Sequence, residues 1–176
     1  MPSPTLFVFS GLPGTGKSTL ARQLAQRRQA PYLRVDTVEA ALLNAGYRAI
    51  TVEGYAVEYG VAEDNLLLGL SVVVDCVNPV GETREAWADV ARRTGSRLVN
   101  VEVICSDGAE HRRRVETRRA DQGNHVGLWS PPDWAALQDY VREYEPWAMP
   151  RLVLDTASGT PQENFAALLD LLGKQT

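Results

Sequence analysis

Cysteine is scarce in this chain. Cys76 and Cys105 are the only two among 176 residues, and each ends an apolar run. We expect both to be buried, reduced thiols rather than a disulfide. A chain of this length can build a full-sized core, and a cytoplasmic protein does not need a disulfide to stabilise its fold.

Long apolar runs and an excess of positive charge are also absent. No stretch approaches a membrane span of about 20 apolar residues. Met1-Pro-Ser-Pro4 lacks the basic region that opens a signal peptide. We therefore expect a cytoplasmic protein with no membrane partner. The net charge of −4 argues against a surface that holds nucleic acid throughout, although a local basic groove remains compatible with it.

Internal repeats, low-complexity tracts and linkers are missing as well. The length fits one domain, so residues 1–176 are predicted to form a single domain. The hydrophobic share of 44% and charged share of 23% are those of an ordinary globular chain.

A glycine-rich stretch directly follows the first apolar run. It reads Gly11-Leu-Pro-Gly-Thr-Gly-Lys-Ser-Thr19 and matches Gly-x-x-x-x-Gly-Lys-Ser/Thr, the P-loop. Its glycines let the backbone curl so that N–H groups point inward at a helix N-terminus, where anions are favoured. The pattern predicts a nucleotide phosphate site made by Gly11, Leu12, Pro13, Gly14, Thr15, Gly16, Lys17, Ser18 and Thr19. Lys17 is expected at the β- and γ-phosphates of ATP, and Ser18 at Mg²⁺.

The same stretch also begins like a dinucleotide-binding fingerprint, with Asp36 at about the distance of a ribose-binding acid. Thr19 occupies the place of the third glycine or alanine, however, and Lys17-Ser18 has no role in that fingerprint. The sequence favours the P-loop.

Apolar runs alternate with helical patterns along the whole chain, which predicts an α/β fold with a parallel sheet between helices. We expect strands over 5–10, 32–35, 71–77, 97–105 and 151–155. We expect helices over 17–29, 38–44, 55–70, 82–93, 110–119, 133–144 and 161–172. In the third helix, Val57, Val61 and Leu68 lie on one side with Asp64 and Asn65, a mixed face.

The residues after the third strand argue against other P-loop classes. A water-orienting Glu commonly follows the acidic residue of that strand in ATPases, but Cys76 follows Asp75 here. No Asn-Lys-x-Asp run of guanine-specific switch proteins occurs, and the chain is too short for the extra helical domain of a ring ATPase.

Asp36 comes at the carboxyl end of the second strand, the sheet edge where ligands bind in such folds. There it can accept the proton of a substrate hydroxyl as a general base. The alternative is a helix N-cap, which uses the carboxylate on backbone N–H groups. Asp75 is predicted to support Mg²⁺ beside Ser18, or else only to hydrogen-bond the loop. Candidate substrate contacts are Arg48, Tyr55 and Asn78.

An arginine-rich helix supplies candidate phosphate clamps. Arg114 and Arg118 are four residues apart and share a face, and Arg119 opens the following loop. We assign Arg112 and Arg113 to surface pairs with Glu116, and expect His111 on the helix surface. The turn-rich segment 119–132 is predicted to be a lid that excludes water, with Trp129, Trp134 and Trp147 packing around it.

With these motifs in this order, the chain resembles the small P-loop kinases. That group includes polynucleotide 5′-kinase, chloramphenicol phosphotransferase, gluconate kinase and adenylylsulfate kinase. The runs Leu-Arg-Val-Asp36, Val-Val-Asp75-Cys-Val-Asn-Pro79 and Val-Ile-Cys-Ser-Asp107 are similar to those of bacterial AAA-family ATP-binding proteins that are kinase-like.

The resemblance implies a P-loop NTPase fold of three layers, with sheet order 2-3-1-4-5. It also implies Asp36 as the base, Arg118 or a neighbour as the clamp, and adenine contacts from residues 157–160. Two features found within this group are missing. The basic patch of a polynucleotide channel is absent, since Arg48 is the only cation between Asp36 and Gly60. The Asp-Gly-Asp-Asn signature of adenylylsulfate kinase does not occur either.

Three functions therefore stand as hypotheses. The first is an ATP- and Mg²⁺-dependent kinase of a small alcohol such as a nucleoside, sugar or antibiotic. The second is a polynucleotide 5′-hydroxyl kinase, and the third is a nucleotide-binding regulatory module without transfer. The oligomeric state stays open.

Overall fold

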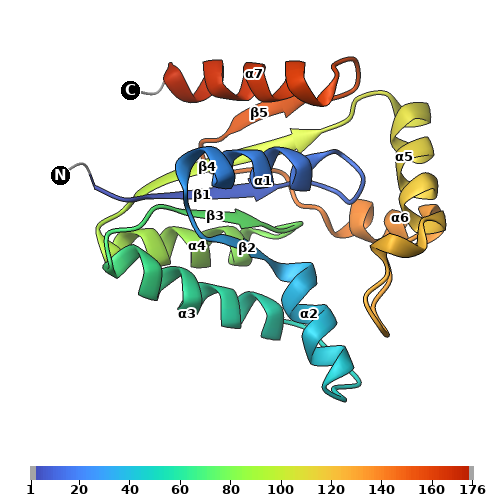
Figure 1. The fold of residues 1–176 in the computed structure, drawn as a ribbon, viewed down its shortest axis with the longest axis horizontal. Coiled ribbons are helices and arrows are strands. Elements are labelled where there is room, and N and C mark those ends of the chain that lie inside the picture. Colours follow the sequence, from blue (N-terminus) through green and yellow to red (C-terminus); the bar gives the residue numbers. More distant parts are fainter. Residues whose placement is uncertain (1–2, 175–176) are drawn as a thin grey trace.

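Five parallel strands make the central sheet of the computed structural model, which describes residues 3–174 (Figure 1). The strands pair in the order β2-β3-β1-β4-β5, which confirms the predicted fold class and strand order. Their bounds are β1 Thr5–Ser10, β2 Tyr32–Arg34, β3 Val72–Asp75, β4 Arg97–Ile104 and β5 Leu152–Asp155.

Helices cover both faces of the sheet. In Figure 1, α1 (Lys17–Arg28) and α7 (Pro161–Gly173) lie on one face, and α3 (Glu53–Leu67) and α4 (Gly81–Thr94) on the other. At the carboxyl edge of the sheet lie α2 (Val35–Asn44), α5 (Gly108–Ala120), the 3₁₀ turn η1 (Gln122–Asn124) and α6 (Trp134–Glu143). Both termini lie at the opposite edge, away from the site described below.

The alternation of side chains along β1 explains this layering. Phe7 and Phe9 pack into the core under α1 and α7, whereas Leu6 and Val8 pack into the core under α3 and α4. Since successive side chains of a strand point to opposite faces, a continuous apolar run fills both cores at once.

The structure orients α3 and corrects one expectation about α2. The mixed face of α3, with Val57, Val61 and Leu68, is the exposed one, and the buried side carries Gly54, Glu58, Ala62 and Leu66. Moreover, α2 begins at Val35 and its N-cap is Arg34. Asp36 therefore lies within the first turn of the helix and is not its cap.

Both cysteines are free thiols, as predicted. Cys76 is buried, but Cys105 is partly exposed, so the prediction of burial is wrong for Cys105. Among residues 3–174, no helix is both long and apolar enough to cross a membrane.

Glu58 is an ionisable residue on the buried side of α3. It is 1% exposed, and neither carboxyl oxygen has a hydrogen-bond partner among the described residues. Burial, and then the nearby charges of Asp75 and Asp36, raise its pKa from 4.5 to about 9. The folded protein thus keeps Glu58 protonated at neutral pH, while the unfolded chain releases this proton near pH 4.5.

The unfolded state consequently binds fewer protons, and the free energy of unfolding should fall as pH rises from 4.5 towards 9. We expect Glu58→Gln to remove this slope and to raise the free energy of unfolding at pH 8 by about 2–4 kcal/mol. Urea unfolding at pH 5, 6.5 and 8 measures this, with the exposed Glu85→Gln as control. Equal pH slopes in wild type and Glu58→Gln would contradict the prediction.

Candidate active site

The P-loop connects β1 to α1 and has no room for larger residues at two glycines. Gly11 has φ 142°, and a Cβ there would lie 2.2 Å from the carbonyl oxygen of Val103. Gly14 has φ 85°, and a Cβ there would lie 2.5 Å from Cγ2 of Val115. The N-cap of α1, Gly16, makes no side-chain capping bond. The first N–H groups of α1 are thus left for an anion.

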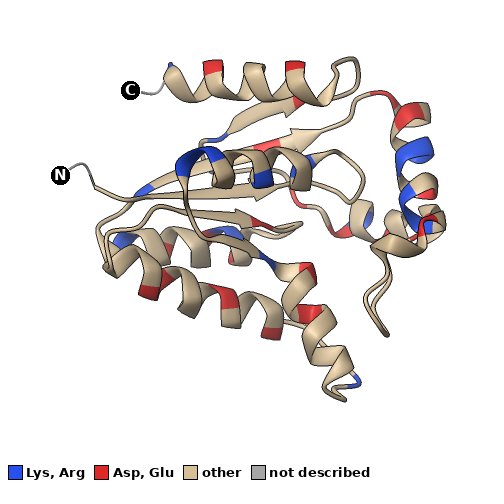
Figure 2. Ribbon diagram, in the orientation of Figure 1, with Lys and Arg blue, Asp and Glu red and all other residues tan. Residues whose placement is uncertain are grey.

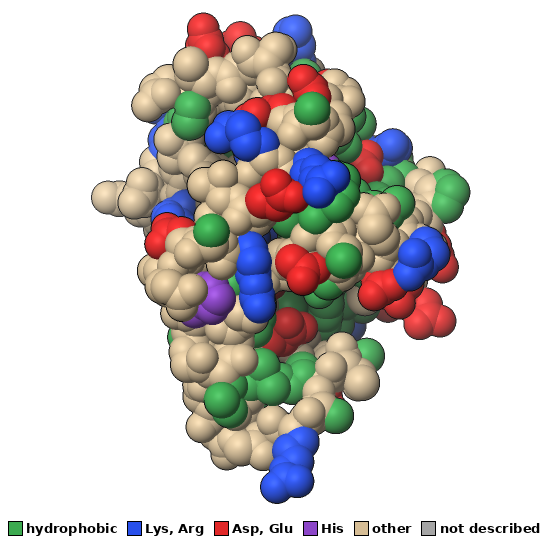
Figure 3. All heavy atoms as spheres, turned by 90° about the vertical axis from the view of Figure 1, so that its right-hand side faces the viewer, with side chains coloured by type: hydrophobic (Ala, Val, Ile, Leu, Met, Phe, Trp, Pro, Cys, Tyr) green, Lys and Arg blue, Asp and Glu red, His purple; other side chains and the backbone are tan. Residues whose placement is uncertain are grey.

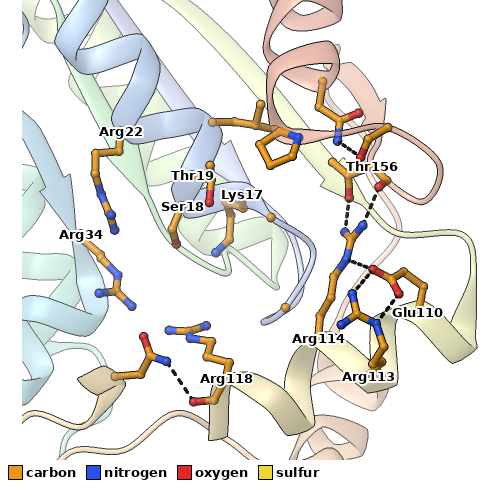
Figure 4. A pocket seen from close by; sticks show the side chains of 17 residues that line it. Lys17, Ser18, Thr19, Arg22, Arg34, Glu110, Arg113, Arg114, Arg118 and Thr156 are labelled. Atoms are coloured by element: carbon orange, nitrogen blue, oxygen red, sulfur yellow. Dashed lines mark hydrogen bonds and ion pairs between the residues drawn. The ribbon is translucent and has the colours of Figure 1, made fainter. Parts of the chain in front are cut away.

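A cavity of about 580 Å³ opens at this loop (Figure 4). Residues of α1, α5, α7, β2 and the segment before α7 line it. One carboxylate, Glu110, faces six cationic side chains in this lining: Lys17, Arg22, Arg34, Arg113, Arg114 and Arg118. Such an excess of positive charge suits a polyphosphate.

Arg114 is fixed in place on one side of this cavity. Its Nη1 and Nη2 donate to Oγ1 and the carbonyl oxygen of Thr156, each at 2.8 Å, and its Nε donates to Glu110 at 2.7 Å. The Thr156 hydroxyl also donates to the carbonyl oxygen of Thr15 in the P-loop at 2.6 Å. Hydrogen bonds from Arg113 and Arg114 lower the pKa of Glu110 to about 2, so this carboxylate stays ionised.

His111 was expected at the surface, and that expectation is wrong. It is 7% exposed, and its Nε2 lies 2.7 Å from the carbonyl oxygen of Pro13. Its ring also contacts Trp134 edge-on. Arg112 pairs with Glu116 as expected, but Arg113 pairs with Glu110 and lines the cavity. Helix α5 therefore both holds the P-loop and supplies charge to it.

Lys17 and Asp75 form a buried pair at the end of β3, with Nζ and Oδ1 3.1 Å apart. The Tyr32 hydroxyl donates to Asp75 Oδ2 at 2.6 Å. Burial opposes ionisation of Asp75, but the charge of Lys17 and hydrogen bonds from Ser18 and Tyr32 hold its pKa below the usual value. Asp75 is thus held as an ionised carboxylate next to Ser18.

Asp36 stands where its carboxylate meets two guanidinium groups. Its Oδ2 accepts from Arg34 Nη2 at 2.6 Å and lies 3.4 Å from Arg118 Nη2. Arg34 also approaches Asp75, with Nε 3.7 Å from Oδ2. Arg34 therefore links the two carboxylates that the sequence singled out. In Figure 4, Arg118 reaches from α5 into the open space between Lys17 and Arg34.

A second cavity, of about 230 Å³, lies between α2, α6 and the predicted lid segment. Its lining residues are Pro13, Lys17, Asp36, Glu39, Val77, Arg118, Trp129, Ser130, Pro132, Ala136 and Tyr140. Trp129 stands over the guanidinium groups of Arg34 and Arg118, at 5.7 and 6.0 Å from its ring centre. Both cavities include Lys17 and Arg118.

The segment 119–132 is held against its surroundings. Arg119 donates from Nη1 to Ser130 Oγ and, at 2.8 Å, to the carbonyl oxygen of Pro131. The side chain of Asn44, at the end of α2, binds the backbone of Val126 and Leu128. Arg119 is therefore turned towards its own loop and not towards the larger cavity.

The three candidate substrate residues lie outside both cavities. Arg48 is exposed between α2 and α3. The Tyr55 hydroxyl accepts from the backbone N–H of Asn78 at 2.8 Å, and Asn78 donates from Nδ2 to Ser10 Oγ at 2.9 Å. Since Asn78 is fully buried, these contacts shape the turn after β3.

The donors at Ser18 and Asp75 fit a magnesium ion. They offer a hydroxyl and an ionised carboxylate, and Mg²⁺ in such sites takes its other ligands from phosphates and water. No group of three His, Cys, Asp or Glu side chains able to hold a metal occurs among residues 3–174, so a closed site made by protein alone is not built here.

Sequence reasoning missed Arg34, Glu39 and Thr156. Glu39 follows Asp36 by three residues on one helix, so the spacing carried a signal. Arg34 lies two residues before Asp36, and since alternate side chains of an extended segment point to one side, that spacing also carried a signal. Thr156 meets Arg114 across 42 residues, a contact that local patterns do not carry.

Comparison with known proteins gives a family match over most of the chain. A family model described as an AAA domain matches residues 6–146. No curated protein matched in the comparison of sequences.

Several solved structures share the fold. The Mycobacterium tuberculosis APS kinase CysC, in complex with AMPPNP and APS, has 22% identity and a TM-score of 0.68, and the alignment covers 98% of this chain and 99% of that one. A gluconokinase from Sinorhizobium meliloti 1021 has 18% identity and a TM-score of 0.69, with 99% and 95% covered. Chaetomium thermophilum Kti12, in complex with ADP-AlF3, has 20% identity and a TM-score of 0.66, with 94% and 98% covered.

Proposed function

The chain belongs to the AAA domain family, and we propose that it is an ATP-dependent kinase that phosphorylates a hydroxyl group of a small molecule. The observation that carries this proposal is the meeting of two cavities at Lys17 and Arg118. The larger cavity has the cationic lining that a nucleoside triphosphate needs. The smaller one has a carboxylate, Asp36, beside the junction. A phosphate at the junction would face an acceptor in the smaller cavity.

In the proposed reaction, the acceptor hydroxyl oxygen forms a bond to the γ-phosphorus of ATP as the bond from that phosphorus to the β,γ-bridging oxygen breaks. The hydroxyl proton passes to the Asp36 carboxylate, and ADP leaves. Lys17 and Arg118 compensate the charge that accumulates on the transferred phosphoryl oxygens. Arg114, fixed by Thr156 and Glu110, belongs to the nucleotide side, and Arg119 holds the lid.

Magnesium fits this scheme at Ser18 and Asp75. When bound, it would neutralise charge on the β- and γ-phosphates. The buried pair with Lys17 keeps Asp75 ionised for that role.

A small acceptor is supported over a polynucleotide. The acceptor cavity measures about 230 Å³, and it contains Glu39 as well as Asp36. On the face that carries the carboxyl edge of the sheet, basic side chains alternate with acidic ones (Figure 3). The densest row of basic residues lies on α5, where acidic residues accompany it (Figure 2). A nucleic-acid path would need a continuous basic strip.

The test is MgATP turnover against nucleosides, sugars, aminoglycosides, chloramphenicol and a 5′-hydroxyl oligonucleotide, with ADP release and acceptor mass followed together. We expect a small acceptor to gain one phosphate for each ADP released. Phosphorylation of the oligonucleotide alone would instead favour the polynucleotide kinase.

A nucleotide-binding module without transfer is the second candidate. It is favoured by the ion pairs of Asp36 Oδ2 with two guanidinium groups, because these give the carboxylate a role in holding Arg34 and Arg118 that needs no phosphoryl transfer. Tight ATP binding with no acceptor consumed across the panel would support this candidate and would contradict the kinase.

A further inference from the structure

Glu39 is the charged side chain of the smaller cavity that has no ionic partner. Of the cavity's other charges, Lys17 pairs with Asp75 and Arg118 with Asp36. No cation lies within ion-pair distance of Glu39 among residues 3–174. The carboxylate is nonetheless half-buried, so its negative charge is neither well hydrated nor compensated.

Glu39 is held by the packing of α2 on α3. Its Cγ and Oε1 lie 3.0 and 3.4 Å from where a Cβ would stand on Gly54, the buried glycine in the first turn of α3. The absence of a side chain at Gly54 therefore makes the space in which Glu39 lies. On the cavity side, Tyr140 of α6 lies close enough for the charges of Glu39 and Asp36, after burial, to raise its pKa.

Glu39 and Asp36 face the same cavity from one helix. They are three residues apart on α2, which places their Cβ atoms about 5–6 Å from each other. An acceptor whose hydroxyl meets Asp36 would thus present to Glu39 a group that lies within about one sugar ring of that hydroxyl. Rings of Trp129 and Tyr140 complete the lining, and Trp129 already stands over two guanidinium groups.

We propose that the acceptor is an amino alcohol whose protonated amine pairs with Glu39 while its hydroxyl meets Asp36. This inference rests on the proposed kinase function and names its substrate class. A half-buried carboxylate without a cation, beside aromatic rings, is complementary to an ammonium group. The cavity volume of about 230 Å³ corresponds to roughly eight water molecules of ~30 Å³, the size range of a single amino sugar.

The protonation behaviour of Glu39 agrees with this assignment. Burial, and then the charge of Asp36, raise its pKa from 4.5 to about 7. The groups around it are Asp36 on its own helix, Tyr55 and Glu58 on α3, Tyr140 on α6, and Arg118 and Lys17 across the cavity. An ammonium ion in contact with Glu39 would supply the missing positive charge and favour the ionised carboxylate.

Two measurements test the inference separately from the kinase activity. The first is calorimetric binding, in the presence of AMPPNP and Mg²⁺, of the single amino sugars glucosamine and galactosamine against their N-acetyl derivatives. We expect each free amine to bind about tenfold or more tightly than its acetylated partner. Equal binding of the two forms, or no binding of either amine, would overturn the amine assignment whatever the turnover assay gives.

The second measurement uses Glu39→Gln with the exposed Glu85→Gln of α4 as matched control. The ratio of kcat/KM for the amine to that for the acetylated acceptor should fall towards one in Glu39→Gln and stay at the wild-type value in Glu85→Gln. If this ratio of kcat/KM values is unchanged in Glu39→Gln, the proposal is wrong.

The failure of each hypothesis has its own signature. If the amine binds through Glu39 but no hydroxyl is phosphorylated, the kinase function fails and the amine site stands. If neutral or anionic acceptors are phosphorylated in preference to amines, the kinase stands and the amine site fails. The wild-type comparison of amine with acetylated acceptor decides this even where Glu39→Gln does not fold.

Discussion

Lys17→Ala should abolish phosphoryl transfer and weaken ATP binding by about tenfold or more. Lys17, like Arg118, lines both cavities, and it also pairs with the carboxylate at the end of β3. Its removal would take away the proposed contact to the transferred phosphate. It also leaves Asp75, 2% exposed, without its nearest countercharge.

That second effect needs its own control, because loss of one partner of a buried ion pair destabilises a fold. Lys17→Arg keeps a cation beside Asp75. We still expect it to lose transfer by at least about tenfold, since a planar guanidinium does not replace a compact ammonium at a phosphate site. Lys174, the only other lysine, is exposed at the end of α7, so Lys174→Ala should behave as wild type.

The measurements are ATP binding by calorimetry and ADP formation with acceptor present, both at a temperature at which each variant is folded by circular dichroism. Wild-type turnover by a folded Lys17→Ala variant would remove the P-loop from the proposed reaction.

The framework of the fold was predictable because its signals are local. Within Thr5–Ser10 the four central residues are all apolar, as expected for a strand covered on both faces, and the glycines of the P-loop follow it directly. The exposed side of α3 was harder to assign. Its buried side holds Gly54, Glu58 and Ala62, which are small or charged, whereas Val57 and Val61 face outward. Hydrophobicity alone points to the wrong side of such a helix.

A residue of the candidate site was predictable only where a short segment around it forms a recognisable motif. Lys17, Asp36 and Arg118 were singled out from position along the chain, and they do lie around one space. Which arginine enters the site depends on tertiary contacts. Arg114 is tied to Thr156, and Arg119 is tied to Ser130, so partners outside α5 decide where each guanidinium group lies. Periodicity within α5 carries no information about those partners.

Asp36→Asn should cut kcat by about 10²–10⁴ while ATP affinity stays close to wild type, the usual range for loss of a general base. The amide has nearly the shape of the carboxylate but cannot take the proton of the acceptor hydroxyl. Since Asp36 is not the N-cap of α2, the change removes no capping bond.

The expected effect of Asp36→Asn on stability depends on the position of Asp36 in α2 and on its two arginine partners. The carboxylate lies in the first turn of α2, where a negative charge contributes about 0.3–1 kcal/mol. It also receives hydrogen bonds from Arg34 and Arg118, in partly exposed positions where ion pairs are worth little. We therefore expect the melting temperature to fall only by a few degrees, as in a surface variant.

Single-turnover kinetics, with the acceptor identified in the turnover test, distinguishes a general base at Asp36 from a carboxylate that only positions Arg34 and Arg118. A slow chemical step with unchanged ATP binding identifies the base, and the exposed Asp170→Asn of α7 serves as the matched carboxylate-to-amide control. A rate equal to wild type in Asp36→Asn would mean that the carboxylate only positions Arg34 and Arg118. The proton of the hydroxyl would then leave by another route, and Glu39, on the same face of α2, is the next carboxylate in reach.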